Sequence, residues 1–385
     1  MVAISRTATM VGATGFLISC SGRLAMGPEM TSSSHWITSH SDFARTGHLE
    51  GVHVNVPLTE LWRRQFMAGV AESPVFRGET VLVPLLNGEV IALSARDGSR
   101  LGRKKFSDGS VLGLTLSGST LYLSLTPERT SLHAYDLLEG KTLWKERIVP
   151  ATGAPAVVME RLFVTGRNGL FCLGASDGSI IWKWTERTPI VPSPALDSGF
   201  VIVSGRDGVV TSRQIESGVV VWKRNLRPER LYSHPVVCGD RVFVTTLAGT
   251  VHAINLREGT PLWIWGDQGD PLYSSVSCDS SSLYVPSSGG KVYRLAIEDG
   301  RVEWTFDAGQ LINLEVAVSD SHVVAVTTRG EILVLSRDSG RELWRTRVEG
   351  RIITPPILHE GLVLIADDRK WLYAFGPAYD GRKDP

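Results

Sequence analysis

The sequence has no excess of charge of either sign. Its 385 residues include 40 Lys and Arg and 40 Asp and Glu, so the formal net charge at pH 7 is zero. Overall charge therefore does not favour capture by nucleic acid or by an anionic bilayer. Long hydrophobic runs are also missing, because no stretch reaches the roughly 18 apolar residues that a membrane-spanning helix needs. We expect neither a nucleic-acid partner nor an internal membrane span.

Cysteine is scarce, at four residues. Cys172, Cys238 and Cys278 lie isolated within strand-like segments and form no Cys-x-x-Cys or Cys-x-x-Cys-His motif, which argues against zinc and c-type haem sites. We expect them to be separate small core residues or weakly exposed thiols. A helical hydrophobic period is absent as well. Glycine is abundant instead, at 39 residues, among runs of Val, Leu, Ile and Thr that favour strands and tight turns.

The first 19 residues have the pattern of an export signal. Arg6 precedes a mostly apolar stretch over residues 8–18, and the run Leu-Ile-Ser-Cys ends at Cys20. This run resembles a bacterial lipobox, in which the cysteine is lipidated and becomes the mature N-terminus. An ordinary secretory signal or a disordered start is the alternative. Because Ser21 follows the cysteine, we expect a lipidated Cys20 to reside in the outer membrane.

An internal repeat of about 40 residues dominates the rest of the chain. Tryptophan recurs at intervals of 38 to 42 residues once Gly102 is counted in the one position that lacks it. A glycine stands four residues before each interior tryptophan. Such a period is typical of a solenoid or propeller. The expected structural docking residues are Trp62, Trp144, Trp182, Trp222, Trp263, Trp304 and Trp344.

Each repeat contains four short strand signals separated by Gly-rich turns, which predicts a four-stranded antiparallel meander. Counting predicts an all-β, eight-bladed β-propeller over residues 58–376. The last blade stops at Phe375 without its own outer strand, and we expect residues 58–66 to complete it and close the ring. Residues 20–57 are predicted to form a tether and cap, with His35 to Gly47 over the ring, and residues 377–385 a tail.

The repeat carries a recognisable motif. Residues 134–144, with the pattern Ala-x-Asp-x-x-x-Gly-x-x-x-Trp, resemble the tryptophan-docking motif of the quinoprotein-like (PQQ-like repeat) β-propeller family, known from pyrroloquinoline quinone (PQQ) dehydrogenases. Residues 253–263 match at the same spacing. Arg294 and Val334 replace the small first residue in two repeats, where we expect looser docking. Kelch and Trp-Asp repeats fit less well, since the chain contains no Trp-Asp dipeptide.

The resemblance covers residues 58–375. Because a ring of this length follows a lipobox, it is most similar to the lipoproteins of this family that assist the assembly and insertion of β-barrel proteins into the outer membrane. The resemblance implies a non-catalytic scaffold with protein partners in the bacterial envelope, such as barrel-assembly machinery. It also implies a monomeric ring that faces the periplasm and contacts the membrane only through a lipid anchor.

A PQQ enzyme or another small-ligand-binding propeller is the alternative. A PQQ enzyme needs a divalent-ion site of carboxylate and amide oxygens, a catalytic base and an aromatic floor for the quinone. Catalytic members of the family often carry two adjacent cysteines, and Cys172, Cys238 and Cys278 are never adjacent. Glu315 is a lone carboxylate that could enter the channel. We therefore predict no catalytic residue, no metal and no cofactor.

The predicted turns also sort charge onto the two faces of the ring. Turns between second and third strands share a face with the blade-to-blade connectors, and the other turns share the opposite face. We expect the first face to be basic and to bind the partner through Arg167, Arg206, Arg227, Arg230, Arg329 and Arg369. The second is expected to be acidic, with Asp177, Glu258, Asp299 and Asp338 among its turn residues. The alternative is a solvated rim, because Asp-Gly and Glu-Gly suit tight turns.

Overall fold

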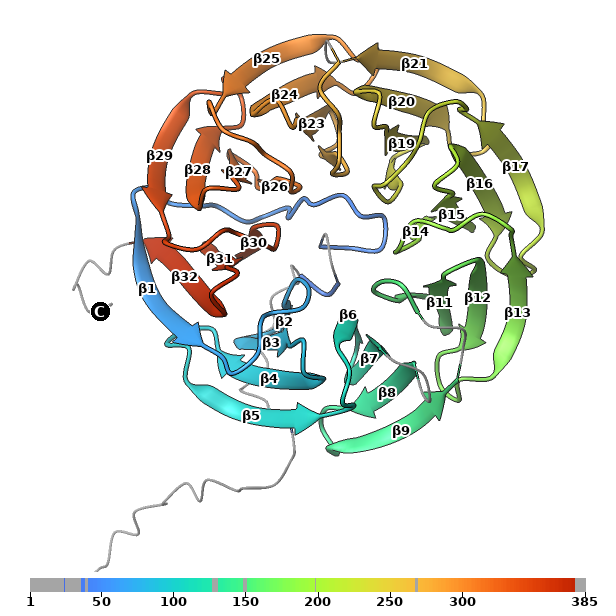
Figure 1. The fold of residues 1–385 in the computed structure, drawn as a ribbon, viewed down its shortest axis with the longest axis horizontal. Coiled ribbons are helices and arrows are strands. Elements are labelled where there is room, and N and C mark those ends of the chain that lie inside the picture. Colours follow the sequence, from blue (N-terminus) through green and yellow to red (C-terminus); the bar gives the residue numbers. More distant parts are fainter. Residues whose placement is uncertain are drawn as a thin grey trace, which may run out of the picture.

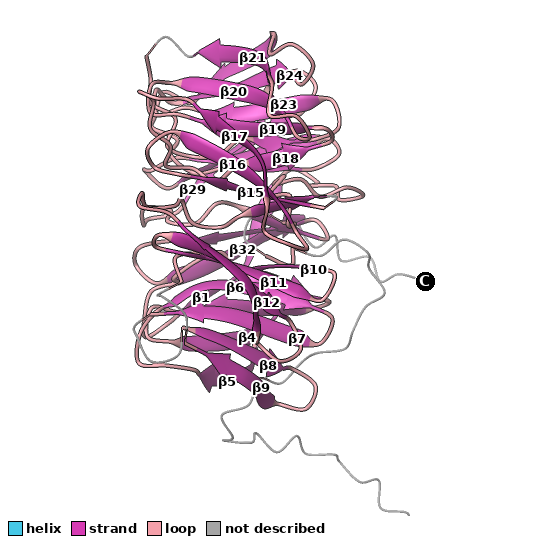
Figure 2. Cartoon of the chain, turned by 90° about the vertical axis from the view of Figure 1, so that its right-hand side faces the viewer, coloured by secondary structure: helices cyan, strands magenta, loops and turns pink. Residues whose placement is uncertain are grey.

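The chain folds into a ring of eight β-sheets around a central axis (Figure 1). The computed structural model describes residues 24, 36–38, 41–126, 131–147, 151–197, 199–266 and 269–377. Within these residues every regular element is a strand, and each sheet has four antiparallel strands. Seen from the side, the ring is a flat disc (Figure 2). The predicted all-β, eight-bladed propeller is confirmed.

Each blade runs from an inner to an outer strand. Blades 1 to 4 comprise β2 (Val75–Arg77), β3 (Thr80–Pro84), β4 (Glu89–Ser94), β5 (Arg100–Lys105); β6 (Val111–Ser117), β7 (Thr120–Leu125), β8 (Leu132–Asp136), β9 (Lys141–Glu146); β10 (Ala156–Val158), β11 (Arg161–Gly166), β12 (Gly169–Gly174), β13 (Ile180–Thr185); and β14 (Ala195–Asp197), β15 (Phe200–Ser204), β16 (Val209–Gln214), β17 (Val220–Asn225). The second and third strands are almost wholly buried, because both faces of each sheet pack against neighbouring blades.

The second half of the ring repeats this order. Blades 5 to 8 comprise β18 (Val236–Cys238), β19 (Arg241–Thr245), β20 (Thr250–Asn255), β21 (Pro261–Gly266); β22 (Ser277–Cys278), β23 (Ser282–Pro286), β24 (Lys291–Ala296), β25 (Val302–Asp307); β26 (Ala317–Val318), β27 (His322–Val326), β28 (Glu331–Ser336), β29 (Glu342–Arg347); and β30 (Ile357–His359), β31 (Leu362–Ala366), β32 (Trp371–Pro377), β1 (Leu58–Gln65). The outer strand of blade 8 is therefore the first strand of the chain.

This closure is made by backbone pairing between the two ends of the domain. β1 runs antiparallel to β32, with partners from Leu58 and Pro377 at one end to Gln65 and Trp371 at the other. The predicted closing strand is confirmed. Joining the first strand to the last leaves no blade without a fourth strand, so the ring has no open sheet between its ends.

The tryptophans of the outer strands join each blade to the next. In six blades the indole Nε1–H donates to a backbone carbonyl of the following blade at 2.7–3.1 Å. The donors are Trp62, Trp144, Trp182, Trp222, Trp263 and Trp304. The indole of each of these tryptophans also lies against a turn glycine with positive φ. One example is Gly178 beside Trp144, where an added Cβ would come within 3 Å of the indole. Trp344 packs beside Phe375.

Two local expectations are wrong. Cys238 and Cys278 form a disulfide between the inner strands of blades 5 and 6, with Cα atoms 6.6 Å apart, whereas Cys172 is a buried free thiol. Docking at Arg294 is not looser, because the Arg294 guanidinium donates to Ser282 and to the Arg337 carbonyl of the next blade. The neighbouring Trp304 keeps its 2.8 Å hydrogen bond.

Candidate partner-binding surface

The strand directions define two faces of the disc. We call connector face the side that carries the turns between second and third strands and the connections between blades. We call cap face the side that carries the other turns, because the N-terminal segment lies there. This cap segment comprises residues 36–38 and 41–57, and Figure 1 shows it crossing the middle of the ring.

Main-chain hydrogen bonds hold the cap segment against the inner strands. Six of the eight inner strands donate a backbone N–H to it at 2.8–2.9 Å, blade after blade around the ring. The donors are Phe76, Leu116, Leu196, Val237, Cys278 and Val318, and the acceptors are the carbonyls of Trp36, Ile37, Phe43, Ala44, Thr46 and Gly47. His35 lies outside the described residues. The cap segment thus satisfies inner-strand groups that would otherwise face the channel.

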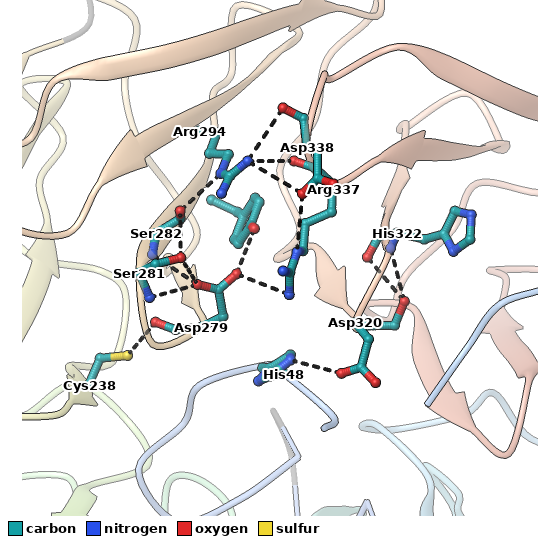
Figure 3. A network of polar contacts seen from close by, with 12 residues as sticks. His48, Cys238, Asp279, Ser281, Ser282, Arg294, Asp320, His322, Arg337 and Asp338 are labelled. Atoms are coloured by element: carbon teal, nitrogen blue, oxygen red, sulfur yellow. Dashed lines mark hydrogen bonds and ion pairs between the residues drawn. The ribbon is translucent and has the colours of Figure 1, made fainter. Parts of the chain in front are cut away.

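A polar network anchors the cap segment on blades 6 and 7 (Figure 3). The Gly51 amide donates to both carboxylate oxygens of Asp320, and His48 lies 4.0 Å from the same carboxylate. Beside it, buried Asp279 accepts hydrogen bonds from the Tyr284 hydroxyl at 2.7 Å and from turn amides. These hydrogen bonds and Arg337 hold the pKa of the Asp279 carboxyl below its ordinary value although burial opposes this.

A buried guanidinium extends from the cap segment into the channel. Arg45 is fully buried and donates to the carbonyls of Pro194 and Ala154 and to the Thr38 hydroxyl at 3.2–3.3 Å. Burial lowers its pKa to about 10, so it stays charged at neutral pH. The Glu72 carboxyl interacts electrostatically with the Arg45 guanidinium. Burial raises the pKa of the Glu72 carboxyl above its ordinary value.

Glu315 is a second carboxyl of the channel. It accepts a hydrogen bond from the Ser275 amide at 3.1 Å. Burial, together with the nearby Glu72 charge, raises the pKa of Glu315 to about 7. Glu72, Glu315 and Arg45 make the channel polar. Within the described residues, however, no three His, Cys, Asp or Glu side chains are arranged to hold a metal ion.

The connector face carries exposed apolar side chains that have no counterpart in our sequence predictions. Met67 is 90% exposed, and Leu86, Tyr232, Tyr273 and Leu311 are 40–52% exposed. All five lie in blade connections or in a turn between second and third strands. The cap face has exposed apolar residues too, namely Leu138, Met159 and Val219, but both exposed tyrosines of the described residues lie on the connector face, and tyrosine is enriched in protein-binding surfaces.

The six predicted arginines lie on this face. Arg167, Arg206, Arg329 and Arg369 occupy turns between second and third strands, and Arg227 and Arg230 lie in the connection between β17 and β18. The Arg206 guanidinium stacks over Tyr232, with its central carbon 5.0 Å from the ring centre. Cationic and aromatic groups therefore share this surface.

The expected division into a basic and an acidic side does not hold. On the connector face Arg227 pairs with Asp207 and Arg369 pairs with Glu349. On the cap face Arg241 lies between Asp240 and Glu298. Both faces therefore carry mixed charge. The prediction considered the arginines of the connector face without its acids, and the acids of the cap face without its arginines. The aromatic connector residues could have been found by asking which apolar residues lie outside the repeat pattern.

The described residues contain no helix long and apolar enough to span a membrane. The motif, the docking tryptophans and the closed ring define the class: the chain is an eight-bladed, quinoprotein-like β-propeller. A family model described as "Outer membrane protein assembly factor BamB" matches residues 128–264, 184–310 and 288–384, which together cover more than half of the sequence. The chain belongs to this family.

Individual relatives agree with the assignment. The BamB protein of Yersinia pestis is 22% identical over 369 residues, covering 87% of this chain and 82% of its own length. The crystal structure of BamB from Moraxella catarrhalis superposes with a TM-score of 0.71 at 14% identity, covering 83% of this chain and 99% of that chain. A europium-containing methanol dehydrogenase has a TM-score of 0.73 at 12% identity, covering 90% of this chain and 99% of that chain. These structural similarities show the shared fold.

Proposed function

We propose that this protein is a non-catalytic scaffold that assists the assembly and insertion of β-barrel proteins into the outer membrane. The matching family model, described as an outer membrane protein assembly factor, supports a role in assembly. The protein binds envelope protein partners, such as barrel-assembly machinery, on the connector face and acts as a single closed ring. The observation that carries the proposal is the contrast between the two faces. The cap segment covers the centre of one face, whereas the other face carries both exposed tyrosines of the described residues, Tyr232 and Tyr273, beside arginines.

The cap segment also argues against a quinone enzyme. The cap segment lines the inner strands at one end of the channel, and Arg45 places a buried guanidinium inside it. Glu72 and Glu315, two carboxyls whose charges interact in the channel, are the observation that favours a small-ligand binder. We therefore expect no calcium-dependent change in PQQ absorbance when the protein is added, and saturable binding would favour the alternative function.

The partner surface is tested by charge reversal. We expect changing Arg167, Arg206, Arg329 and Arg369 to Glu to weaken co-purification of envelope partners and to lower the levels of outer-membrane barrels. Exposed turn charges contribute only about 0–1 kcal/mol each to folding, so the ring should stay folded. The matched control changes Asp177, Glu258, Asp299 and Asp338 to Lys on the cap face. Equal losses from both sets would reject the assignment of the surface.

The proposed location is the periplasmic side of the outer membrane, with Cys20 as a lipid anchor. Cys20 and the signal over residues 1–19 lie outside the described residues. The Cys238–Cys278 disulfide supports export, because disulfides persist mainly in oxidising compartments. We expect Cys20→Ala to accumulate as unprocessed precursor without acyl label. A wild-type chain that takes up no labelled fatty acid would show that the lipobox interpretation is wrong.

A further inference from the structure

Leu24 is buried at the junction of blades 1 and 2. Its side chain is 0% exposed and belongs to a hydrophobic cluster formed by strands of both blades. The cluster includes Ala92 of β4 and Leu137, which follows β8, and Leu101 of β5 packs against it. A residue 34 positions before the first strand is therefore part of the propeller core.

This junction is the one where the repeat lacks its docking tryptophan. Gly102 of β5 takes the tryptophan position and pairs with Ala92, as Trp144 pairs with Ala134 in blade 2. At the seven other junctions an indole packs between the blades. Leu24, Ala92 and Leu137 belong to the apolar cluster of this junction, which contains no indole.

The position of Leu24 limits how far a lipid on Cys20 can lie from blade 1. Only residues 21–23 separate the two, and an extended chain spans at most about 3.5 Å per residue. Four residue steps of chain can span at most about 14 Å, which is the longest tether between the buried Leu24 and a lipid on residue 20. A lipid at this position would keep the rim of blades 1 and 2 near the bilayer, instead of letting the ring move on a long tether.

The outer strand of blade 1 has a charge pattern that fits such a position. β5 carries Arg100, Arg103, Lys104 and Lys105 and no acidic residue. No other outer strand carries as many cations: β17 has two, β21 has none, and β25 has two acids instead. Arg103 and Lys105 are 63% and 53% exposed, and their partners Glu89 and Asp108 lie at 4.0 and 2.8 Å.

We propose that β5 is a membrane-facing rim that contacts anionic phospholipid headgroups. The inference rests on the proposed acylation of Cys20 and goes beyond the proposed function, because it fixes how the disc stands relative to the bilayer. Cations near an anionic surface are attracted to it, and the four cations of β5 with their two acidic partners, Glu89 and Asp108, leave a net charge of two that supplements the lipid anchor. The zero net charge of the whole chain does not oppose this local attraction.

The orientation is tested with the acylated full chain in vesicles that contain anionic and brominated phospholipids. A fluorophore is attached to Arg103→Cys or, as the matched control, to Ile264→Cys in β21 on the opposite rim. Cys172 is buried and Cys238 is oxidised, so the new thiol is the reactive one. We expect bromine quenching for Arg103→Cys and little for Ile264→Cys. Equal quenching, or stronger quenching at position 264, would overturn the proposal.

The charge contribution is tested without the anchor. The Cys20→Ser chain should float with anionic vesicles at low salt and not with neutral ones. Changing Arg100, Arg103, Lys104 and Lys105 together to Gln should lower this binding roughly tenfold or more. The control pair Lys223→Gln and Arg224→Gln in β17 should change it little. Equal effects of the two sets contradict the proposal, whereas absence of acyl label on wild-type Cys20 rejects only the anchor.

Discussion

At the scale of residues, the period of 40 predicted the docking positions but not every partnership. A tryptophan and a turn glycine recur in most repeats, and the structure brings them together across six blade junctions. Cys238 and Cys278 are separated by 40 residues, which is one repeat, so they occupy equivalent places in adjacent blades. That spacing predicts that the two cysteines lie close together in neighbouring blades, whereas each cysteine taken alone predicts only a small buried residue. Leu24 gave no such signal, because it lies outside the repeat.

Glu315 gives a prediction at this scale. Burial raises its pKa from 4.5 to about 7, so the folded state favours the neutral acid. The unfolded chain ionises at lower pH, and stability is therefore lost as pH rises from about 4.5 to 7. Glu315→Gln should remove this loss and stabilise the protein at pH 8 by on the order of 1–3 kcal/mol. Urea unfolding at pH 5 and pH 8 measures the free energy of unfolding of each protein, with the exposed Glu60→Gln variant as the control. Parallel pH profiles of this free energy for wild type and Glu315→Gln would contradict the account.

At the scale of elements, strand counting predicted the blades and the closing strand. The inner three strands repeat eight times, so the missing fourth strand of blade 8 had to come from elsewhere in the chain. The sequence predicted that residues 35–47 cover the ring but not the path of the cap segment, because main-chain hydrogen bonds to six inner strands fix that path. Its buried side chains, such as Trp36, Val54 and Arg45, lie outside the repeat, so the period does not predict their burial.

The closing strand gives a prediction for the whole domain. Deleting residues 58–65 should open the ring and cause aggregation, because β32 loses its partner and blade 1 loses the Trp62 contact. Trp62→Ala should cost about 3–5 kcal/mol while leaving the pairing in place. Thermal unfolding measures both changes. The exposed Arg63→Ala serves as the control in the same strand. An unchanged unfolding temperature after the deletion would refute closure by β1.

At the scale of the whole molecule, the sequence predicted which residues share a face better than the character of that face. Turn order placed the six arginines together, but charge counting missed their acidic neighbours Asp207 and Glu349. Exposed connector residues such as Tyr232 and Tyr273 are apolar residues outside any strand, and strand patterns do not predict their exposure. The cap segment then makes the two faces unequal, since it occupies one of them.

The most direct test of the proposed scaffold is a map of partner contacts in living cells. A photo-crosslinking amino acid is placed on the connector face at Arg206, Tyr273 or Leu311, and on the cap face at Asp177, Asp240 or Asp299. The account predicts adducts with envelope assembly proteins from the connector-face positions and none from the cap-face positions. Adducts that arise equally from both faces, or only from the cap face, would contradict it.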